Sequence, residues 1–525
     1  GRNGSLTVAL GDNEGPFHLD IEIDADLVQL PPVLARAVSD QVFLRELDLV
    51  QIIEGRANGR LVLDNSSGET QTAVEVNEWD LKGSYQRFPF SLKLDGGCLL
   101  YKGPTLSVRS LNGHIGQSKV NNVSGSFDWS RGPVLDLASS NTSRVLVDEL
   151  FPWLKTLPGA MKRLPNIRAL TGTLWVDSFA FKGDLTRPDS WEFLLNGRTK
   201  DLVVDSDQLP DTLRIKSGAF VASPETLQIV DFDLSCADAT LTASGKIIEP
   251  VFDPKSLDFS FHGTIGPEAG DWVADLIHMP TDLRVRHPVS TQAMRLTWNR
   301  NAPVRVSGSC NLAGGPELSI ELERGPEELC AKRLTITDEE SNAVLALCIS
   351  SDAIEFGFKG DLGAETIKRL FHKDLRLSGS LEGDVSGRIA SSHLAGLTAD
   401  GTLTVRDLCY TPARGVPVRV ESAVMDAKGD ILQVKTAAIR LQETPYDLKG
   451  NVVLTGGELQ LDLDLSASDI DWDSLRSSLA SWETETDDRE KTATSGESFL
   501  GMPVRGTVRV HAGQFTSGDT TWKPF

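Results

Sequence analysis

Apolar and polar residues alternate along many short runs of this chain. From Leu19 to Asp24 and again from Leu459 to Leu465, every second residue is Leu or Ile and most of the residues between them are acidic. A period of two places the apolar residues on one face of a β-strand and the polar residues on the other. Such runs recur between Gly, Pro, Asp and Asn turns and predict roughly 25 to 30 antiparallel strands.

A few short stretches carry apolar residues at helical spacing instead. They are rich in Trp, Leu and Phe, and they occupy residues 31–40, 148–163, 271–278, 364–372 and 471–481. One apolar stripe on a short helix is far more often a packing surface than a ligand site. We therefore expect short helices that plug the ends of the strand-rich units.

The chain also repeats itself. Residues 47–61 (LDLVQIIEGRANGRL) and 375–389 (LRLSGSLEGDVSGRI) keep the same Glu-Gly and Gly-Arg pairs at equal spacing. The intervals between units are longer than solenoid repeats and suit a multi-strand unit copied in tandem. The predicted organisation is the end of a preceding repeat unit at 1–40, β repeat units at 41–160, 161–280, 281–375 and 376–480, a flexible acidic loop at 481–498, and the start of a next unit at 499–525.

Composition agrees with a folded chain and argues against nucleic acid as a partner. The 525 residues are 40% apolar and 24% charged, a balance typical of globular proteins. Lys and Arg number 52 against 74 Asp and Glu, which gives a net charge of -22. Such a chain binds nucleic acid only through a local basic patch, and no run of the sequence forms one.

Cysteine usage points to no metal site. The six cysteines lie far apart without a C-x-x-C pair, so neither a zinc site nor a dense disulfide framework is indicated. Cys348 lies in the apolar run AVLALCIS and is interpreted as a small buried apolar residue.

The search for catalytic motifs finds none. There is no G-x-S-x-G or H-E-x-x-H, the eight histidines are scattered singly, and the recurring Asp-x-Asp pairs lie on one strand face without the glycine-bearing loop of a calcium site. We therefore expect a protein that is not an enzyme and that needs no cofactor. An enzyme acting on polysaccharides would require a cleft with clustered acids and aromatic residues.

The predicted fold class is all-β, with repeated antiparallel β-meander units that form an elongated curled sheet or groove and short helices at the unit ends. Each strand then has one apolar face that must be covered, and few helices are available to cover it. Either two sheets close on each other as sandwiches, or one elongated sheet curls into a groove that a guest fills; local sequence does not separate these. The residues expected to line the apolar face are Leu257, Phe259, Phe261, Ile354, Phe356, Phe358, Leu459, Leu461, Leu463 and Leu465.

The strand openings and endings resemble a known family. Residues 172–176, 401–405 and 506–510 read GTLWV, GTLTV and GTVRV, and residues 461–472 read LDLDLSASDIDW. This texture is similar to the AsmA-like family of bacterial envelope proteins, in particular the long YhdP-type members, which are kin to TamB. The likeness covers nearly the whole chain and is clearest over residues 376–525.

The resemblance implies a function as well as a fold. Such proteins resemble bridge-like lipid carriers, with an anchor in the inner membrane and a long β-sheet groove across the periplasm. It implies intermembrane transport of phospholipid or another acyl lipid in support of outer-membrane integrity, periplasmic localisation, and a partner at the outer membrane. No apolar stretch here approaches a membrane span and no signal peptide is present, so we expect a fragment whose anchor lies outside it. The alternative is a non-catalytic structural or assembly factor for outer-membrane biogenesis.

Overall fold

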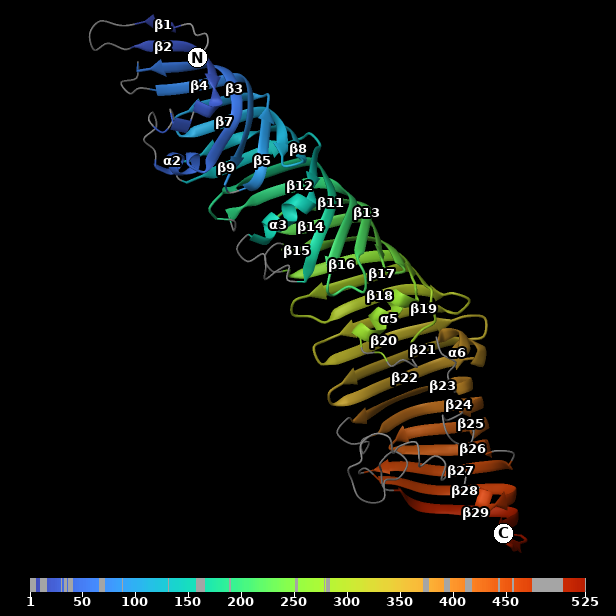
Figure 1. Cartoon of the computed structure of the whole chain (residues 1–525). Coiled ribbons are helices and arrows are strands. Elements are labelled where there is room, and N and C mark those ends of the chain that lie inside the picture. The colour runs from blue at the N-terminus through green and yellow to red at the C-terminus, as the bar shows by residue number, and fades with distance from the viewer. Residues whose placement is uncertain are drawn as a thin grey trace. The chain divides into compact units, whose positions relative to one another are not determined.

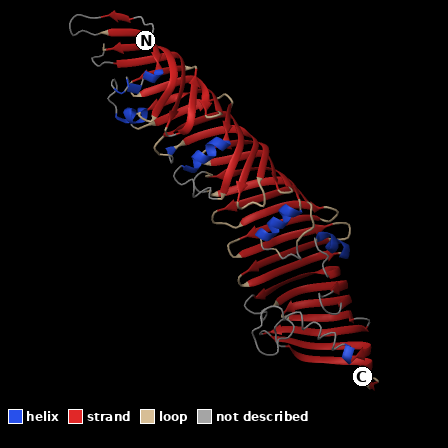
Figure 2. Cartoon of the chain, in the orientation of Figure 1, coloured by secondary structure: helices blue, strands red, loops and turns tan. Residues whose placement is uncertain are grey.

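Strands dominate the structure. In this computed structural model, 73% of the described residues are in strands and 10% are in helices. Figure 2 shows the strands in red and the few short helices in blue. The predicted fold class, all-β meanders with few short helices, is confirmed. The structure describes residues 6–9, 17–29, 31–32, 35, 41–65, 71–86, 88–130, 132–156, 166–187, 190–250, 254–277, 279, 284–371, 377–390, 397–410, 418–441, 444–455, 458–474 and 504–524.

The chain divides into two compact units, Gly1–Phe259 and Ser260–Phe525. In the first unit the described strand pairs are all antiparallel, and most strands pair with their neighbours along the chain. Its elements are β1 (Leu6–Ala9), β2 (His18–Asp26), the 3-10 helix η1 (Leu27–Gln29), α2 (Gln41–Leu47), β3 (Val50–Asp64), β4 (Gln71–Tyr85), β5 (Phe88–Asp95), β6 (Cys98–Lys102), β7 (Thr105–Ile115), β8 (Ser118–Asp128), β9 (Val134–Ser139), β10 (Ser143–Leu146), α3 (Val147–Thr156), β11 (Ile167–Asp184), β12 (Glu192–Ser206), β13 (Leu213–Ala222), β14 (Thr226–Cys236) and β15 (Ala239–Ile248). The exceptions to pairing in chain order are β5 and β6, which both lie between β4 and β7, and β9 and β10, which both lie between β8 and β11.

The second unit is a meander in strict chain order from β17 to β28 (Figure 1). The strand β16 (Ser256–Ile265) contains the boundary between the units. The following elements are α5 (Pro267–Leu276), β17 (Val289–Asn299), β18 (Val304–Leu312), β19 (Glu317–Arg324), β20 (Glu328–Thr337), β21 (Asn342–Ser350), β22 (Ala353–Leu362), α6 (Ala364–Leu370), β23 (Leu377–Ala390), β24 (Thr398–Tyr410), β25 (Val418–Gly429), β26 (Ile431–Leu441), β27 (Thr444–Thr455), β28 (Glu458–Asp471), β29 (Val504–Ser517) and β30 (Thr520–Trp522).

One strand pair departs from the antiparallel pattern. β29 runs parallel to β28, with Leu463 opposite Val508. Parallel neighbours need a long connection, and residues 472–503 supply it here. The predicted acidic loop at 481–498 belongs to this connection and lies outside the described residues.

Helices recur after every six strand positions in the described part of the chain. β11 to β16 precede α5, β17 to β22 precede α6, and β23 to β28 precede a helical turn at residues 472–474. Between α2 and α3 the count is also six, because β5 and β6 share one position between β4 and β7, and β9 and β10 share one between β8 and β11. The architecture is therefore repeat-like, whereas the predicted residue boundaries of the repeat units stay a prediction.

Three helices lie where the sequence predicts them, whereas α2 (Gln41–Leu47) and η1 (Leu27–Gln29) lie outside the predicted stretches. α3, α5 and α6 match the stretches predicted at 148–163, 271–278 and 364–372. Most of the stretch at 31–40, and the stretch at 471–481 beyond its first turn, lie outside the described residues. After an even number of antiparallel strands, the chain is back at the side of the sheet where the first of these strands began. In the second unit, Val285 before β17 accordingly forms a β-bridge with Phe371 after α6.

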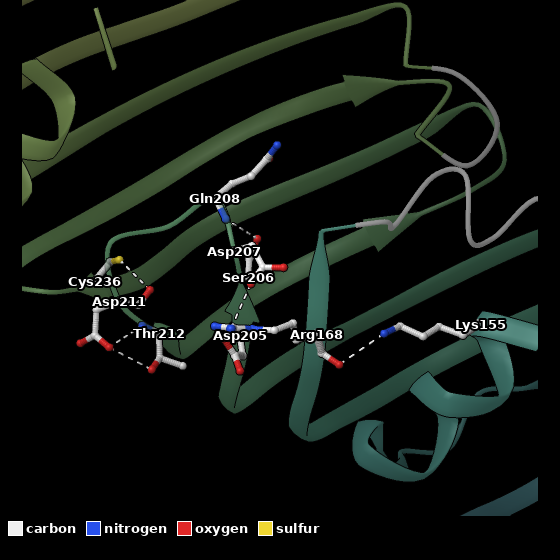
Figure 3. Close-up of polar contacts among 9 residues, drawn as sticks. All are labelled: Lys155, Arg168, Asp205, Ser206, Asp207, Gln208, Asp211, Thr212 and Cys236. Atoms are coloured by element: carbon white, nitrogen blue, oxygen red, sulfur yellow. Dashed lines mark hydrogen bonds and ion pairs between the residues drawn. The ribbon is translucent and has the colours of Figure 1, made fainter. Parts of the chain in front are cut away.

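α3 shows how such a helix is held. Val147 and Phe151 are buried on the sheet against Leu202 of β12. At the C-terminal end, the Lys155 ammonium donates hydrogen bonds to the carbonyl oxygens of Ile167 at 2.8 Å and Arg168 at 3.3 Å. Figure 3 shows Lys155 reaching from α3 toward β11, where the Arg168 side chain bonds to Asp205. The helix thus covers the apolar side chains at one edge of the first unit's sheet.

Candidate functional site

The strand β22 carries three of the residues predicted to line the apolar face. Ile354 and Phe356 are half-buried and Phe358 is buried, whereas Glu355 and Lys359 between and beside them are exposed. The side chains therefore alternate in exposure along this strand with a period of two. Ile354, Phe356 and Phe358 lie on one face of the second unit.

Strand register extends this face from β18 to β28 of the second unit. Residues directly opposite each other on paired strands have their side chains on the same face. If directly paired residues are followed from Phe358 in both directions, every position reached from β18 to β28 is apolar or glycine. This first row is Gly308, Ile320, Leu334, Leu345, Phe358, Val385, Gly401, Ala427, Leu432, Val452 and Leu461.

A second row runs beside the first and is equally free of charge. It contains Cys310, Leu318, Ile336, Ala343, Gly360, Gly383, Leu403, Met425, Val434, Gly450 and Leu463. Packing agrees with register, because the buried cluster around Ile336 and the buried cluster around Val405 share the neighbours Leu381 and Leu403. These two rows and the residues packed on them are called the apolar face below.

The leucines of β28 belong to the same face. Leu459, Leu461, Leu463 and Leu465 are all half-buried, and Gln460 and Asp462 between them are exposed. Leu465 lies directly opposite Leu448 of β27, which packs on the cluster around Val405. The register therefore brings two predicted groups of site residues, from β22 and β28, onto one surface.

The third predicted group lies on β16. Leu257, Phe259 and Phe261 are half-buried, and Ser260 and His262 are exposed, which again gives a period of two. Phe259 lies over Gly245 of β15, since a Cβ atom built on that glycine would be 2.2 Å from the ring. The unit boundary passes through this strand, so these residues are described by strand position alone.

The helix α6 covers the apolar face along one side, and the face is open farther from this helix. Ile367 and Leu370 of α6 pack on Leu318 and Ile336, and all four side chains are buried. Farther from α6 the same strands are less covered: Leu347 is 40% exposed and Ile349 is 42% exposed. The described part of the second unit contains no second sheet layered over this face. The apolar surface beyond α6 is therefore accessible.

The opposite face of the same strands is charged. Lys359 of β22 binds Asp384 of β23 at 2.6 Å, and Arg406 of β24 binds Glu382 at 2.9 Å. The ammonium of Lys332 on β20 holds the pKa of the Glu323 carboxyl on β19 below its usual range, helped by Arg305 on β18. Exposed pairs of this kind stabilise only slightly, but they keep this face in water.

One candidate for metal binding is removed by the structure. Among the described residues, one group of acidic, Cys and His side chains is close enough to share a metal ion. It consists of Glu328, Cys330 and Cys348. Cys330 and Cys348, directly opposite on β20 and β21, form a disulfide, so neither sulfur can bind a metal as a thiolate. The interpretation of Cys348 as a small buried apolar residue is therefore wrong: it is half-buried on the charged face and bonded to Cys330. Burial raises the pKa of the free Cys310 thiol to about 11.

Comparison of the chain with protein-family models, curated proteins and solved structures gives no match. None of the helices in the described part combines the length and apolar composition needed to cross a membrane.

Proposed function

We propose that this chain carries lipid along its apolar face, between the inner and outer membranes of a bacterial envelope. The observation that carries the proposal is the pair of uncharged rows from β18 to β28. An acyl chain on this surface would meet no charge and no break in the apolar floor. Each CH₂ group removed from water contributes about 0.8 kcal/mol, so an acyl chain suits this surface better than a polar ligand does.

Partial exposure supports a carrier rather than a closed core. Side chains in the core of a sandwich are covered by a second sheet. Here Leu347 is 40% exposed, and Phe356, Leu461 and Leu463 are half-buried. A lipid that moves along the protein needs a surface of this kind, which is apolar and also exposed.

The disulfide supports a location outside the cytosol. Disulfides persist in oxidising compartments, among them the bacterial periplasm, and are rare in the cytosol. The Cys330–Cys348 bond joins neighbouring strands of the second unit. A periplasmic location agrees with the carrier role proposed here.

Native mass spectrometry of gently purified protein tests whether lipid is bound. We expect phospholipid or another acyl lipid to co-purify with the chain. Protein that carries no lipid, and that takes none up from added vesicles, would favour the alternative of a structural or assembly factor.

Site-specific photo-crosslinking locates the lipid. A photoreactive residue at Phe356 or Leu463 should crosslink lipid, whereas one at the adjacent Glu355 or Asp462, on the charged face, should not. Phe356→Glu and Leu463→Glu should abolish lipid binding with a nearly unchanged Tm, because an ionised carboxylate facing hydrocarbon costs several kcal/mol. Collapse of the Tm in both variants, with no lipid crosslinked to the unmutated face, would contradict the proposal.

A further inference from the structure

A basic cluster lies on the charged face of the first unit, although no run of the sequence predicts a basic patch. Strand register aligns Lys119 of β8, Arg144 of β10, Trp175 of β11 and Arg198 of β12 in directly opposite positions. Lys200 follows on β12, opposite Thr173. The cations are distant in sequence and become neighbours only through strand pairing.

Part of this cluster surrounds a pocket of about 310 Å³. The pocket lies on the face opposite to the apolar one, because Leu174 between Thr173 and Trp175 packs beneath α3. A bulge helps to shape it: Gly172 has a φ of +121° and faces Asp201, whose own φ is 51°. The lining residues are Arg144, Gly172, Thr173, Trp175, Lys200 and Asp201.

The pocket cations are not used by the protein itself. On the charged faces most cations near acidic groups are paired, as Arg198 is with Asp177 at 2.9 Å. Within the described part of the chain, neither Arg144 nor Lys200 makes an ion pair or a side-chain hydrogen bond. In a chain of net charge -22, two unpaired cations that line one pocket favour an anionic ligand.

The remaining lining groups indicate what else the ligand carries. Trp175 is 36% exposed, which leaves an apolar ring surface beside the cations. The Asp201 carboxylate accepts hydrogen bonds and repels a bare anion, and the Thr173 hydroxyl both donates and accepts. We propose that this pocket binds a phosphorylated sugar: the phosphate contacts Arg144 and Lys200, the sugar hydroxyls donate to Asp201, and the sugar ring packs on Trp175.

Calorimetric titration of the whole chain with three probes tests this proposal. Glucose 6-phosphate should bind at least about tenfold more tightly than inorganic phosphate or glucose, because only it uses both halves of the pocket. Arg144→Gln combined with Lys200→Gln should weaken glucose 6-phosphate by at least about tenfold, since charge-assisted hydrogen bonds are lost. Lys182→Gln is the matched control, as Lys182 is an exposed cation on β11 outside the pocket.

Asp201→Asn separates a sugar phosphate from a simple anion. Asn tolerates the positive φ, so the backbone should keep its shape. The variant should bind glucose 6-phosphate more weakly, because an amide oxygen is a weaker hydrogen-bond acceptor for the sugar hydroxyls than a carboxylate. It should bind inorganic phosphate more tightly, because the negative charge that repels the phosphate is removed.

Equal affinity for glucose 6-phosphate and inorganic phosphate would overturn the proposal, as would an unchanged affinity in the double variant. Binding to phosphatidylglycerol vesicles without binding to the soluble sugar phosphate would also overturn it. Lipid crosslinking at Phe356 should be unaffected by the pocket variants, so this inference and the proposed lipid transport can fail separately.

Discussion

The phenyl ring of Phe356 lies against Gly387, the residue directly opposite it on β23. A Cβ atom built on Gly387 would be 2.5 Å from the ring, so the aromatic side chain occupies the space that a larger neighbour would need. A phenylalanine ring also lies against a glycine of a neighbouring strand at Phe220 and Gly197, which are directly opposite, at Phe232 and Gly218, and at Phe259 and Gly245. Phenylalanine beside glycine is thus a repeated way of building the apolar surfaces of these strands.

Gly387→Ala should destabilise the second unit by about 1–3 kcal/mol, because the added methyl group would lie 2.5 Å from the Phe356 ring and 2.7 Å from the Thr398 carbonyl oxygen and would therefore overpack the site. Urea unfolding measures the change. Gly357→Ala is the matched control, since its Cβ would meet only Ala346 at 3.6 Å, an ordinary contact. Equal stability losses in the two variants would show that the ring contact is not the cause.

The alternation along each strand could be predicted from sequence, whereas the partners across strands could not. A period of two fixes which residues of β22 and β28 share a face, because it depends only on local backbone geometry. That Phe356 lies opposite Gly387 depends on turn lengths and bulges, such as the register shift between Ser378 and Ser380 of β23. Local sequence contains no such information.

Pairing between strands also explains two features that the sequence does not predict, the disulfide and the basic cluster. Cys330 and Cys348 are 18 residues apart with no motif around them, and only the β20–β21 register makes them neighbours. Lys119 and Lys200 join one basic cluster through the pairing of β8, β10, β11 and β12. Spacing along the chain gives no signal for either.

A buried and an exposed position on the apolar face should respond differently to the same substitution. Ile336 is 0% exposed beneath α6, so Ile336→Glu should lower stability by several kcal/mol through an unsolvated carboxylate. Leu347 is 40% exposed, so Leu347→Glu should leave the Tm nearly unchanged and reduce lipid crosslinking at Phe356. Thermal unfolding followed by circular dichroism measures the first effect. Leu347→Glu protein with undiminished crosslinking would show that lipid does not use this part of the face.

Removing the disulfide should destabilise the second unit. The bond closes a loop with a sequence separation of 18 residues, and the loss of that constraint on the unfolded chain corresponds to about 3 kcal/mol. Cys330→Ser combined with Cys348→Ser should therefore unfold at lower urea concentration than the oxidised parent. Cys98→Ser is the control, as Cys98 is a free cysteine of the first unit. Thiol alkylation of unreduced protein in denaturant should modify Cys310 and Cys409 but neither Cys330 nor Cys348; modification of all four would contradict the disulfide.

A buried polar group holds α6 against the sheet and should make stability depend on pH. The Ser341 hydroxyl donates to Thr366 and the Thr366 hydroxyl donates to Asp338, both at 2.7 Å, and Arg369 binds Asp338 at 3.1 Å. Burial raises the pKa of the Asp338 carboxyl, but the Thr366 hydroxyl, the Glu340 backbone N–H and the Arg369 charge together hold that pKa below its ordinary value. A carboxyl with a depressed pKa in the folded state contributes stability above its unfolded pKa of about 3.9 and loses it as pH falls through the lower folded value.

Thr366→Val should remove part of this contribution. The variant keeps the shape of a side chain that is 0% exposed, but it removes the hydroxyl that donates to Asp338 and accepts from Ser341. Asp338 keeps Arg369 and the Glu340 backbone N–H, and the Ser341 hydroxyl keeps the Gly363 backbone N–H. We expect a loss of about 1–3 kcal/mol near neutral pH. The pKa of Asp338 should rise toward its ordinary value, so the stability of the variant should fall less steeply in acid than that of the parent. Urea unfolding from neutral pH down to below the ordinary pKa of aspartate measures both curves, with the exposed Thr398→Val as control. A stability difference between Thr366→Val and the parent that stays constant throughout this range would show that the hydroxyl does not stabilise the ionised carboxylate.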